Sequence, residues 1–264
     1  MRILYLGNNW LGWQVLKWLK KQGEEIIGLV VHPPDRRKYG KDIIKTAKLN
    51  SSCIFDGSLL HTRETFERIK TLQPEIGISV LFGYILRQEF LDIMPAGCLN
   101  LHPSLLPYNR GVFPNVWSIV EGTPAGATIH YMDVGIDTGD IVSQMQIEIE
   151  PIETGESLYH KLEDACLELF KKTWPLIRRG RAPRISQSPQ AGSYHHIKDI
   201  KKLDRIDLDR KYTARKLIDI IRARTFSPYA GAYFQTKGRK IYLRLQLLRE
   251  EDIGKERDER DNRD

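Results

Sequence analysis

The sequence predicts an α/β protein with a doubly wound, mostly parallel sheet and a small C-terminal module of a helix and a hairpin. Two observations favour the sheet: short apolar runs alternate with segments of helical spacing from residue 2 to about residue 180, and the run at 76–81 has the unbroken apolar character of a buried strand. A third observation favours the module. Beyond a stretch rich in Pro, Gly and Ser, the chain alternates across Lys237-Gly238, which is typical of a β-hairpin.

Local signals justify each element in turn. Residues 11–23 carry apolar side chains on one helical face and end at Gly23, where a C-terminal cap belongs. Residues 62–73 begin with a capping Thr62 and an early Glu64. Strands are expected at 2–7, 25–32, 53–55, 76–81, 98–102, 127–132 and 141–149, and a hairpin at 231–245. Further helices are expected near 43–49, within 82–94, near 113–121, and at 157–180 and 213–223.

These elements divide the chain into four parts. We expect a first domain at 1–180, which is long enough to bury a sizeable core. A linker at 181–193 follows, then a small subdomain at 194–249. The remaining residues, 250–264, have no apolar periodicity and are expected to form a charged, disordered tail.

Composition predicts a cytoplasmic protein. The chain has 264 residues, of which 41% are hydrophobic and 28% charged, which is ordinary for a globular protein. No apolar run reaches the about 18 residues of a transmembrane helix, and the N-terminus shows no signal-peptide pattern. Cys53, Cys98 and Cys166 have neither metal-binding nor disulfide spacing, so we expect reduced core cysteines and no metal site.

Positive charge is concentrated in the C-terminal module. Residues 198–249 contain 15 Lys and Arg against 5 Asp and Glu, whereas the last fifteen residues are net negative. A basic segment of this size attracts an anion such as a nucleotide, a phosphate or RNA. The alternative is a solvated lysine-rich surface without a ligand.

The turn GNNWLG, residues 7–12, lies where a phosphate-binding loop would be. It fits neither the dinucleotide-binding nor the P-loop pattern, so a nucleotide-phosphate role is weakly supported. We expect instead that Asn9 and Trp10 line a substrate cleft.

Asn100 and His102 end a predicted strand and are followed at once by Pro103. Alternation along a strand places both side chains on the same face. An amide donor beside a titratable imidazole suits the oxyanion of an acyl transfer, with the imidazole able to move a proton. Taken alone, such a pair is more often a satisfied polar pair that ties down a loop.

The loop DVGIDTGD, residues 133–140, can bring a carboxylate to the same place. Its glycines allow a sharp turn between two predicted strands. A carboxylate beside His102 would orient the ring and raise the pKa of the imidazole. EF-hand spacing is absent, so a Ca²⁺ loop is disfavoured.

Together, LNLHPSLLPYNRG (99–111) and GATIHYMDVGIDTGDIV (126–142) resemble the N10-formyltetrahydrofolate-dependent formyltransferases. This family includes purine glycinamide ribonucleotide, methionyl-tRNA and nucleotide-sugar enzymes. The resemblance covers roughly residues 1–249 and implies a Rossmann-like formyltransferase domain. It implies N10-formyltetrahydrofolate as formyl donor, without a metal, and Asn100, His102 and Asp137 as the catalytic residues.

The resemblance also implies binding residues for the donor. The segment after strand 76–81 matches the one whose backbone holds the pterin ring, and the 133–140 loop matches the opposite side. The implied donor-binding residues are Phe82, Gly83, Tyr84, Ile85, Leu86, Asp133, Thr138, Gly139 and Asp140.

The C-terminal module favours one acceptor. Purine enzymes resemble the first domain alone, whereas methionyl-tRNA enzymes carry a further β-barrel that we do not expect here. The chain therefore looks most like an N-formyltransferase acting on a UDP- or dTDP-linked aminodideoxy sugar for surface glycans. A methionyl-tRNA formyltransferase-like enzyme, a non-catalytic folate- or nucleotide-binding module and a formyltetrahydrofolate hydrolase stay open as alternatives.

The sugar nucleotide would supply the anion for the basic module. Nucleic acid and membrane partners are not expected, and the resemblance is compatible with a homodimer. The expected acceptor contacts, besides Asn9 and Trp10, are Ser104, Tyr108, Arg110, Gly111, Tyr194, Lys198, Arg222, Arg224, Phe226 and Tyr229.

Overall fold

The computed structural model describes residues 1–188 and 191–253. These residues form two compact units. The first comprises Met1–Pro114, Pro124–Ile147 and Leu162–His195, and the second comprises Asn115–Thr123, Glu148–Lys161 and the chain from His196 onward. The predicted tail lies mostly outside the described residues.

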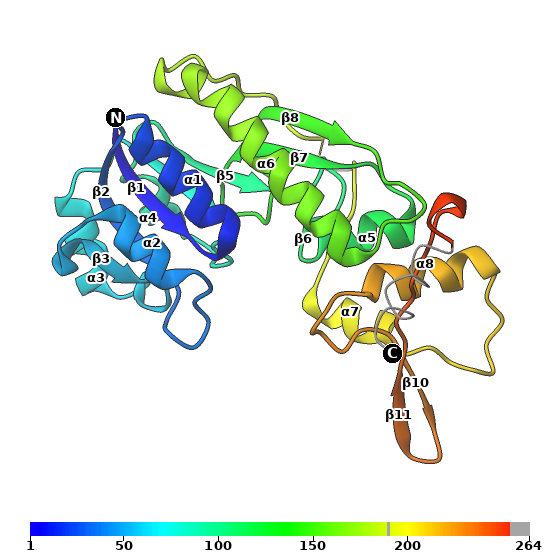
Figure 1. Cartoon of the computed structure of the whole chain (residues 1–264). Coiled ribbons are helices and arrows are strands. Elements are labelled where there is room, and N and C mark those ends of the chain that lie inside the picture. The colour runs from blue at the N-terminus through cyan, green and yellow to red at the C-terminus, as the bar shows by residue number, and fades with distance from the viewer. Residues whose placement is uncertain (189–190, 254–264) are drawn as a thin grey trace, which may run out of the picture. The chain divides into compact units, whose positions relative to one another are not determined.

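The first unit is built on a seven-stranded sheet in the order β3-β2-β1-β4-β5-β7-β8 (Figure 1). The five strands β1 to β5 run parallel, and β7 and β8 are antiparallel to their neighbours. The predicted doubly wound, mostly parallel sheet is therefore confirmed. Its strands are β1 (Arg2–Gly7), β2 (Glu25–Val31), β3 (Ile54–Asp56), β4 (Ile76–Val80), β5 (Cys98–His102), β7 (Ala125–Tyr131) and β8 (Ile141–Ile147).

Helices cover both faces of this sheet. One apolar core contains side chains of α1 (Asn9–Lys21), α2 (Gly40–Ala47) and the C-terminal part of α6 (Gly155–Arg178). The core on the other face contains side chains of α3 (Arg63–Thr71) and α4 (Gln88–Leu91). β1 and β4 are buried almost throughout, which explains their unbroken apolar sequences. β8, at the sheet edge, alternates beyond its first residues.

Short elements complete the first unit. β6 (Arg110–Gly111) follows the turn after β5 and pairs with β9 (Tyr194–His195). The 3-10 turns Ser51–Cys53 and Gly57–Leu59 flank β3. Thr62 caps α3 as predicted, because its hydroxyl accepts a hydrogen bond from the Thr65 amide.

The second unit contains the predicted C-terminal helix and hairpin. Its helices include α5 (Pro114–Glu121), α7 (Ile197–Asp204) and α8 (Ala214–Arg224), and the N-terminal part of α6 contributes as well. The hairpin is β10 (Tyr233–Thr236) and β11 (Arg239–Tyr242), joined through Lys237 and Gly238 as expected. A last 3-10 turn spans Glu250–Asp252. Ile206, Ile220 and Ala232 form a small core of this unit.

Candidate active site

Three polar side chains lie in a row across neighbouring strands. Asn100 of β5 is paired in register with Ser79 of β4 on one side and with His130 of β7 on the other. The Ser79 hydroxyl donates to Oδ1 of Asn100 at 2.9 Å. Nδ2 of Asn100 lies 3.2 Å from Nε2 of His130. Because Ser79 occupies its carbonyl, Asn100 presents its amide NH₂ group toward His130.

Asp137 brings a carboxylate to this row from the loop after β7. Its Oδ1 lies 3.4 Å from Nδ2 of Asn100 and 3.4 Å from Nε2 of His130. Its Oδ2 lies 3.7 Å from Nδ1 of His102 and accepts a 2.8 Å hydrogen bond from the Gly111 amide. The predicted Asn, His and Asp therefore come together, with His130 as a fourth member.

Glutamine 187 holds the Asp137 loop in place. Nε2 of Gln187 donates to the main-chain oxygens of Asp137 and Gly139, at 3.0 and 2.7 Å. Its Oε1 accepts a 2.8 Å hydrogen bond from the Arg110 guanidinium. Asp137 itself has a positive φ of 54°, so the loop needs such support. Gln187 lies in the predicted linker, and no sequence signal assigned it to the site.

The residues of this loop that were predicted to bind the formyl donor stabilise the conformation of the loop. Oδ1 of Asp133 accepts hydrogen bonds from the Gly135 amide and the Thr138 hydroxyl, at 3.0 and 2.7 Å. A Cβ at Gly139 would lie 1.9 Å from the Tyr131 carbonyl oxygen, so only glycine fits there. Asp140 accepts a hydrogen bond from Ser186 at 3.0 Å.

Burial and neighbouring groups shift the pKa values of Asp137 and His102. Burial acts to raise the pKa of Asp137, but His102, His130 and the Gly111 amide outweigh it and hold that pKa well below its usual range. Burial lowers the pKa of His102, and the Asp137 carboxylate does not offset this. Asp137 does raise the pKa of His102 as expected, but burial outweighs it and the net pKa lies below the usual value. At neutral pH an ionised Asp137 and a neutral His102 are therefore favoured.

Each imidazole has a defined tautomer. Nε2 of His102 lies 3.3 Å from the Asn109 carbonyl oxygen, which can only accept, so Nε2 carries the hydrogen. The lone pair on Nδ1 of neutral His102 then faces the Asp137 side. By the same reasoning Nδ1 of His130 donates to the Tyr131 carbonyl at 2.8 Å, leaving Nε2 toward Asn100 and Asp137.

His130 is the member of this cluster that the sequence reading missed. It sits in a predicted strand and is only 2% exposed. The residue type alone does not separate it from a core histidine. Its role depends on the antiparallel register that places it opposite Asn100, and no local signal specifies that register.

Residues 1–173 match the formyl transferase family, and residues 199–249 match the N-formyltransferase dimerization C-terminal domain. The chain belongs to the formyl transferase family. It is an enzyme that transfers formyl groups, as its family and the assembled Asn100, His102 and Asp137 agree.

Relatives of this formyltransferase include two kinds of enzyme. A methionyl-tRNA formyltransferase of Clostridioides difficile is 32% identical over 239 residues, which cover 88% of this chain and 76% of that protein. A sugar N-formyltransferase from Shewanella superposes with a TM-score of 0.78 at 26% identity, covering 94% of this chain and 99% of the other. A formyltransferase from Anoxybacillus kamchatkensis, solved with UDP-4,6-dideoxy-4-formamido-L-AltNAc and tetrahydrofolate, is 30% identical with a TM-score of 0.54, covering 76% and 89%.

The predicted donor segment, residues 82–86, follows β4 directly beside the catalytic strand. Phe82 and Leu86 are buried, whereas Gly83 and Ile85 are exposed. None of these five residues belongs to a helix or a strand.

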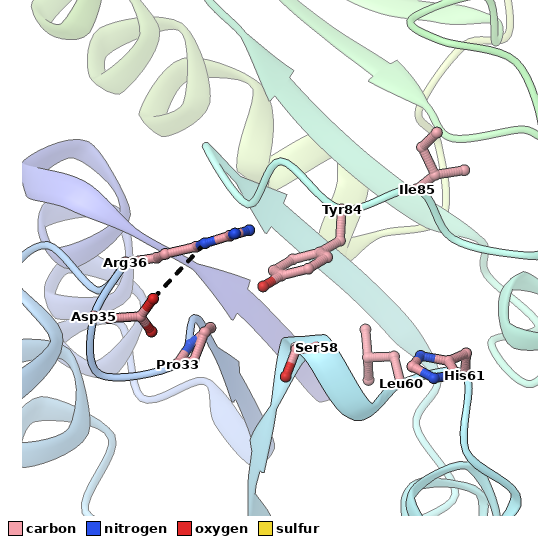
Figure 2. A pocket seen from close by; sticks show the side chains of 9 residues that line it. Pro33, Asp35, Arg36, Ser58, Leu60, His61, Tyr84 and Ile85 are labelled. Carbon is pink, nitrogen blue, oxygen red and sulfur yellow. Dashed lines mark ion pairs between the residues drawn. The ribbon is translucent and has the colours of Figure 1, made fainter.

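A pocket of about 390 Å³ adjoins this segment. It lies between the loops that follow β2 and β3, and Tyr84 and Ile85 line it on the side of the segment (Figure 2). The Tyr84 ring extends over the pocket toward the exposed ion pair of Asp35 and Arg36. The donor segment therefore forms one wall of a cavity.

The predicted acceptor contacts of the first unit lie in different surroundings. The Asn9 side chain accepts from the Trp10 amide at 2.9 Å, at the start of α1. Ser104 is fully buried, and its hydroxyl has no hydrogen-bond partner in the described part of the chain. Arg110 donates to Gln187, and the Gly111 amide donates to the Asp137 carboxylate. Tyr108 and Tyr194 are more than a third exposed.

The remaining predicted contacts belong to the second unit. Arg222 donates to the Glu153 carbonyl and pairs with Asp219, both at 2.8 Å, and Arg224 forms an ion pair with Asp204. Phe226 contacts the rings of Tyr159 and Tyr229, and Lys198 is exposed. Both arginines thus have structural partners within this unit.

Two further findings concern the described residues as a whole. Among residues 1–188 and 191–253, no group of three or more His, Cys, Asp or Glu side chains is arranged to hold a metal ion. None of the helices described combines the length and apolar character that a membrane crossing requires.

Proposed function

We propose that this formyltransferase moves the formyl group of N10-formyltetrahydrofolate to the amine of a nucleotide-linked aminodideoxy sugar. The observation that carries the proposal is the match along nearly the whole chain to a sugar N-formyltransferase from Shewanella. The bound UDP-sugar and tetrahydrofolate of the Anoxybacillus enzyme support the same acceptor and donor classes. The match of residues 199–249 to a dimerization domain favours a homodimer.

The donor would lie along residues 82–86, with the Asp137 loop on its other side. When bound, it supplies the activated formyl carbon. Asn100 donates from Nδ2 to the formyl oxygen as negative charge develops there, because Ser79 has already fixed the orientation of the amide.

Neutral His102 acts as the proton carrier. As the new C–N bond forms between the acceptor nitrogen and the formyl carbon, Nδ1 of His102 takes the proton that the nitrogen loses. Ionised Asp137, 3.7 Å from Nδ1, stabilises the resulting imidazolium. His102 then returns the proton to N10 as the bond between N10 and the formyl carbon breaks.

The methionyl-tRNA formyltransferases are the second candidate class. The relative from Clostridioides difficile, 32% identical over 239 residues, favours it. An RNA acceptor would use the positive charge of residues 198–249 in sequence-independent phosphate contacts. Binding of RNA with a steep dependence on salt would support that class.

One assay separates the candidates. Purified protein and N10-formyltetrahydrofolate are incubated with UDP- and dTDP-linked 3-amino and 4-amino sugars, with methionyl-tRNA, or without acceptor, and the products are identified by mass. We expect a gain of one formyl group on one sugar nucleotide. Formyl-methionyl-tRNA as the sole product would overturn the sugar proposal, and formate release without acceptor would indicate a hydrolase.

A further inference from the structure

His32, the residue after β2, reaches across to the donor segment. It is half-buried, and its Nε2 is hydrogen-bonded to the main-chain oxygen of Phe82. A carbonyl oxygen can only accept, so Nε2 of His32 is the donor. The bond joins two stretches of chain that lie fifty residues apart.

This bond matters because little else fixes the segment's backbone. In the described part of the chain, it is the one hydrogen bond found to the main chain of residues 82–86. Leu81 and Gly83 both have left-handed backbone, with φ of 49° and 70°. A leucine in that region is strained, so surrounding contacts must hold the conformation.

The His32 ring also packs on the side chains of the segment. Its centroid lies 5.5 Å from that of Phe82 and 5.0 Å from that of Tyr84, both in edge-on geometry. The Tyr84 hydroxyl has no hydrogen-bond partner among the described residues, so packing alone places this ring. Gly57 closes the cluster, since a Cβ there would lie 2.7 Å from the Phe82 ring.

The surroundings keep His32 uncharged. Burial lowers the pKa of its imidazole, and Arg36 and Arg37 lower it further, while the Phe82 carbonyl and Asp56 act in the opposite direction. A neutral ring with hydrogen on Nε2 can pack edge-on against two aromatic rings and donate one hydrogen bond without a buried charge.

We propose that His32 is a positioning residue for the formyl donor: it holds the Phe82 carbonyl and the Tyr84 ring so that residues 82–86 present their main chain to the pterin. The inference rests on the proposed donor and adds the residue that follows β2, a strand that contributes none of the four side chains of the Asn100, His102, His130 and Asp137 cluster. His32 acts on donor binding and leaves the reacting atoms to Asn100 and His102.

Three substitutions test the geometry of the bond. His32→Gln keeps an N–H donor near the position of Nε2, whereas His32→Asn carries its donor too near the backbone, and His32→Leu has none. Binding of tetrahydrofolate is measured by calorimetry, together with KM for N10-formyltetrahydrofolate, kcat and binding of the sugar nucleotide. Circular dichroism and the melting temperature confirm that each variant is folded.

We expect His32→Leu and His32→Asn to weaken tetrahydrofolate binding about tenfold, as loss of one hydrogen bond predicts. KM for the donor should rise in parallel, with kcat at saturation and acceptor binding nearly unchanged, and His32→Gln should restore most of the affinity. If His32→Gln, His32→Asn and His32→Leu bind tetrahydrofolate equally well, the positioning role of His32 is overturned. Parallel losses of tetrahydrofolate binding and sugar-nucleotide binding would overturn it as well. If the wild-type protein itself binds no tetrahydrofolate, the proposed donor fails, and the inference fails with it.

Discussion

The carboxylate of Asp137 faces two imidazoles at once: its Oδ2 lies 3.7 Å from Nδ1 of His102, and its Oδ1 lies 3.4 Å from Nε2 of His130. All three side chains are buried or nearly so. This arrangement holds the pKa of Asp137 low, and in the proposed mechanism His102 then gains and loses the proton. Most of the following expectations depend on it.

His102 should titrate below the ordinary histidine value of about 6.5. Burial disfavours its charged form, so the imidazole stays neutral until the pH falls below that value. Because neutral His102 is the proton acceptor, activity should be retained at and above pH 6.5 and lost on the acid side of the lowered pKa. NMR titration of the His102 ring measures this pKa directly.

Asp137→Asn provides the matched control for that titration. The carboxylate raises the pKa of His102, so its replacement by a neutral amide should move the pKa of His102 further down. The variant should also lose most of its kcat, because the imidazolium is no longer stabilised. A higher His102 pKa in Asp137→Asn would contradict the assigned electrostatics.

Asn100→Ala should lower kcat by about 10²–10³ with small effects on both KM values, as for loss of one oxyanion donor. Ser79→Ala serves as the graded comparison. It leaves the Asn100 amide in place and removes only the hydroxyl that donates to Oδ1, so a smaller loss is expected. Steady-state kinetics in both substrates checks the order of the two variants.

His130→Ala should reduce kcat a few-fold, because Nε2 of His130 accepts from the Asn100 amide and an ordinary hydrogen bond contributes about 0.5–1.5 kcal/mol. His130 helps to hold the pKa of Asp137 low, and it lies within hydrogen-bonding distance of the Asn100 amide. The Asp137 carboxyl should therefore titrate higher in this variant, which carbon-detected NMR can follow. Wild-type kinetics in His130→Ala would show that it is only a core residue.

Gly111→Ala should impair both stability and catalysis. Gly111 has a φ of 89°, and a Cβ would lie 2.4 Å from the His195 carbonyl oxygen. Its amide also holds Oδ2 of Asp137. Gly122→Ala is the control, because Gly122 has a positive φ of 67° but open space around its Cβ position.

Both glycine variants should lose about 1 kcal/mol or more of unfolding free energy from backbone strain. Only Gly111→Ala should also lose kcat, since only there does the added methyl group displace a catalytic contact. Denaturant unfolding and kinetics of the two variants measure the two effects separately. Equal kcat in Gly111→Ala and Gly122→Ala would show that the Gly111 amide does not contribute to catalysis.

The sequence predictions that the structure confirms were those based on local patterns. Apolar runs, helical spacing and the Thr62 cap depend on residues close together in the chain, so the order of strands and helices could be predicted. Asn100 and His102 share a face because alternation in a strand is a local property. The formyl transferase family followed from motifs in fixed order along the chain.

The pairing register of distant strands and the burial of individual side chains could not be predicted from the sequence. His130 joins the site through antiparallel pairing with β5, and Gln187 through a contact made fifty residues from Asp137. The direction of the His102 pKa shift depended on how deeply the ring is buried, which outweighs the nearby carboxylate. The sequence shows that Arg222 and Arg224 are positively charged. It does not show that Asp219 and Asp204 of the same unit form ion pairs with them.

The sequence by itself therefore determined the fold class, because apolar periodicity is a local property. Its resemblance to known motifs indicated the reaction family and the predicted set of Asn100, His102 and Asp137. The tertiary structure alone decided that His130 joins this cluster, what holds Asp137 in place and that His32 contacts residues 82–86. Those properties arise from desolvation and from hydrogen bonds between distant residues, such as that of His32 with Phe82. They exist only once the sheet has brought those residues together.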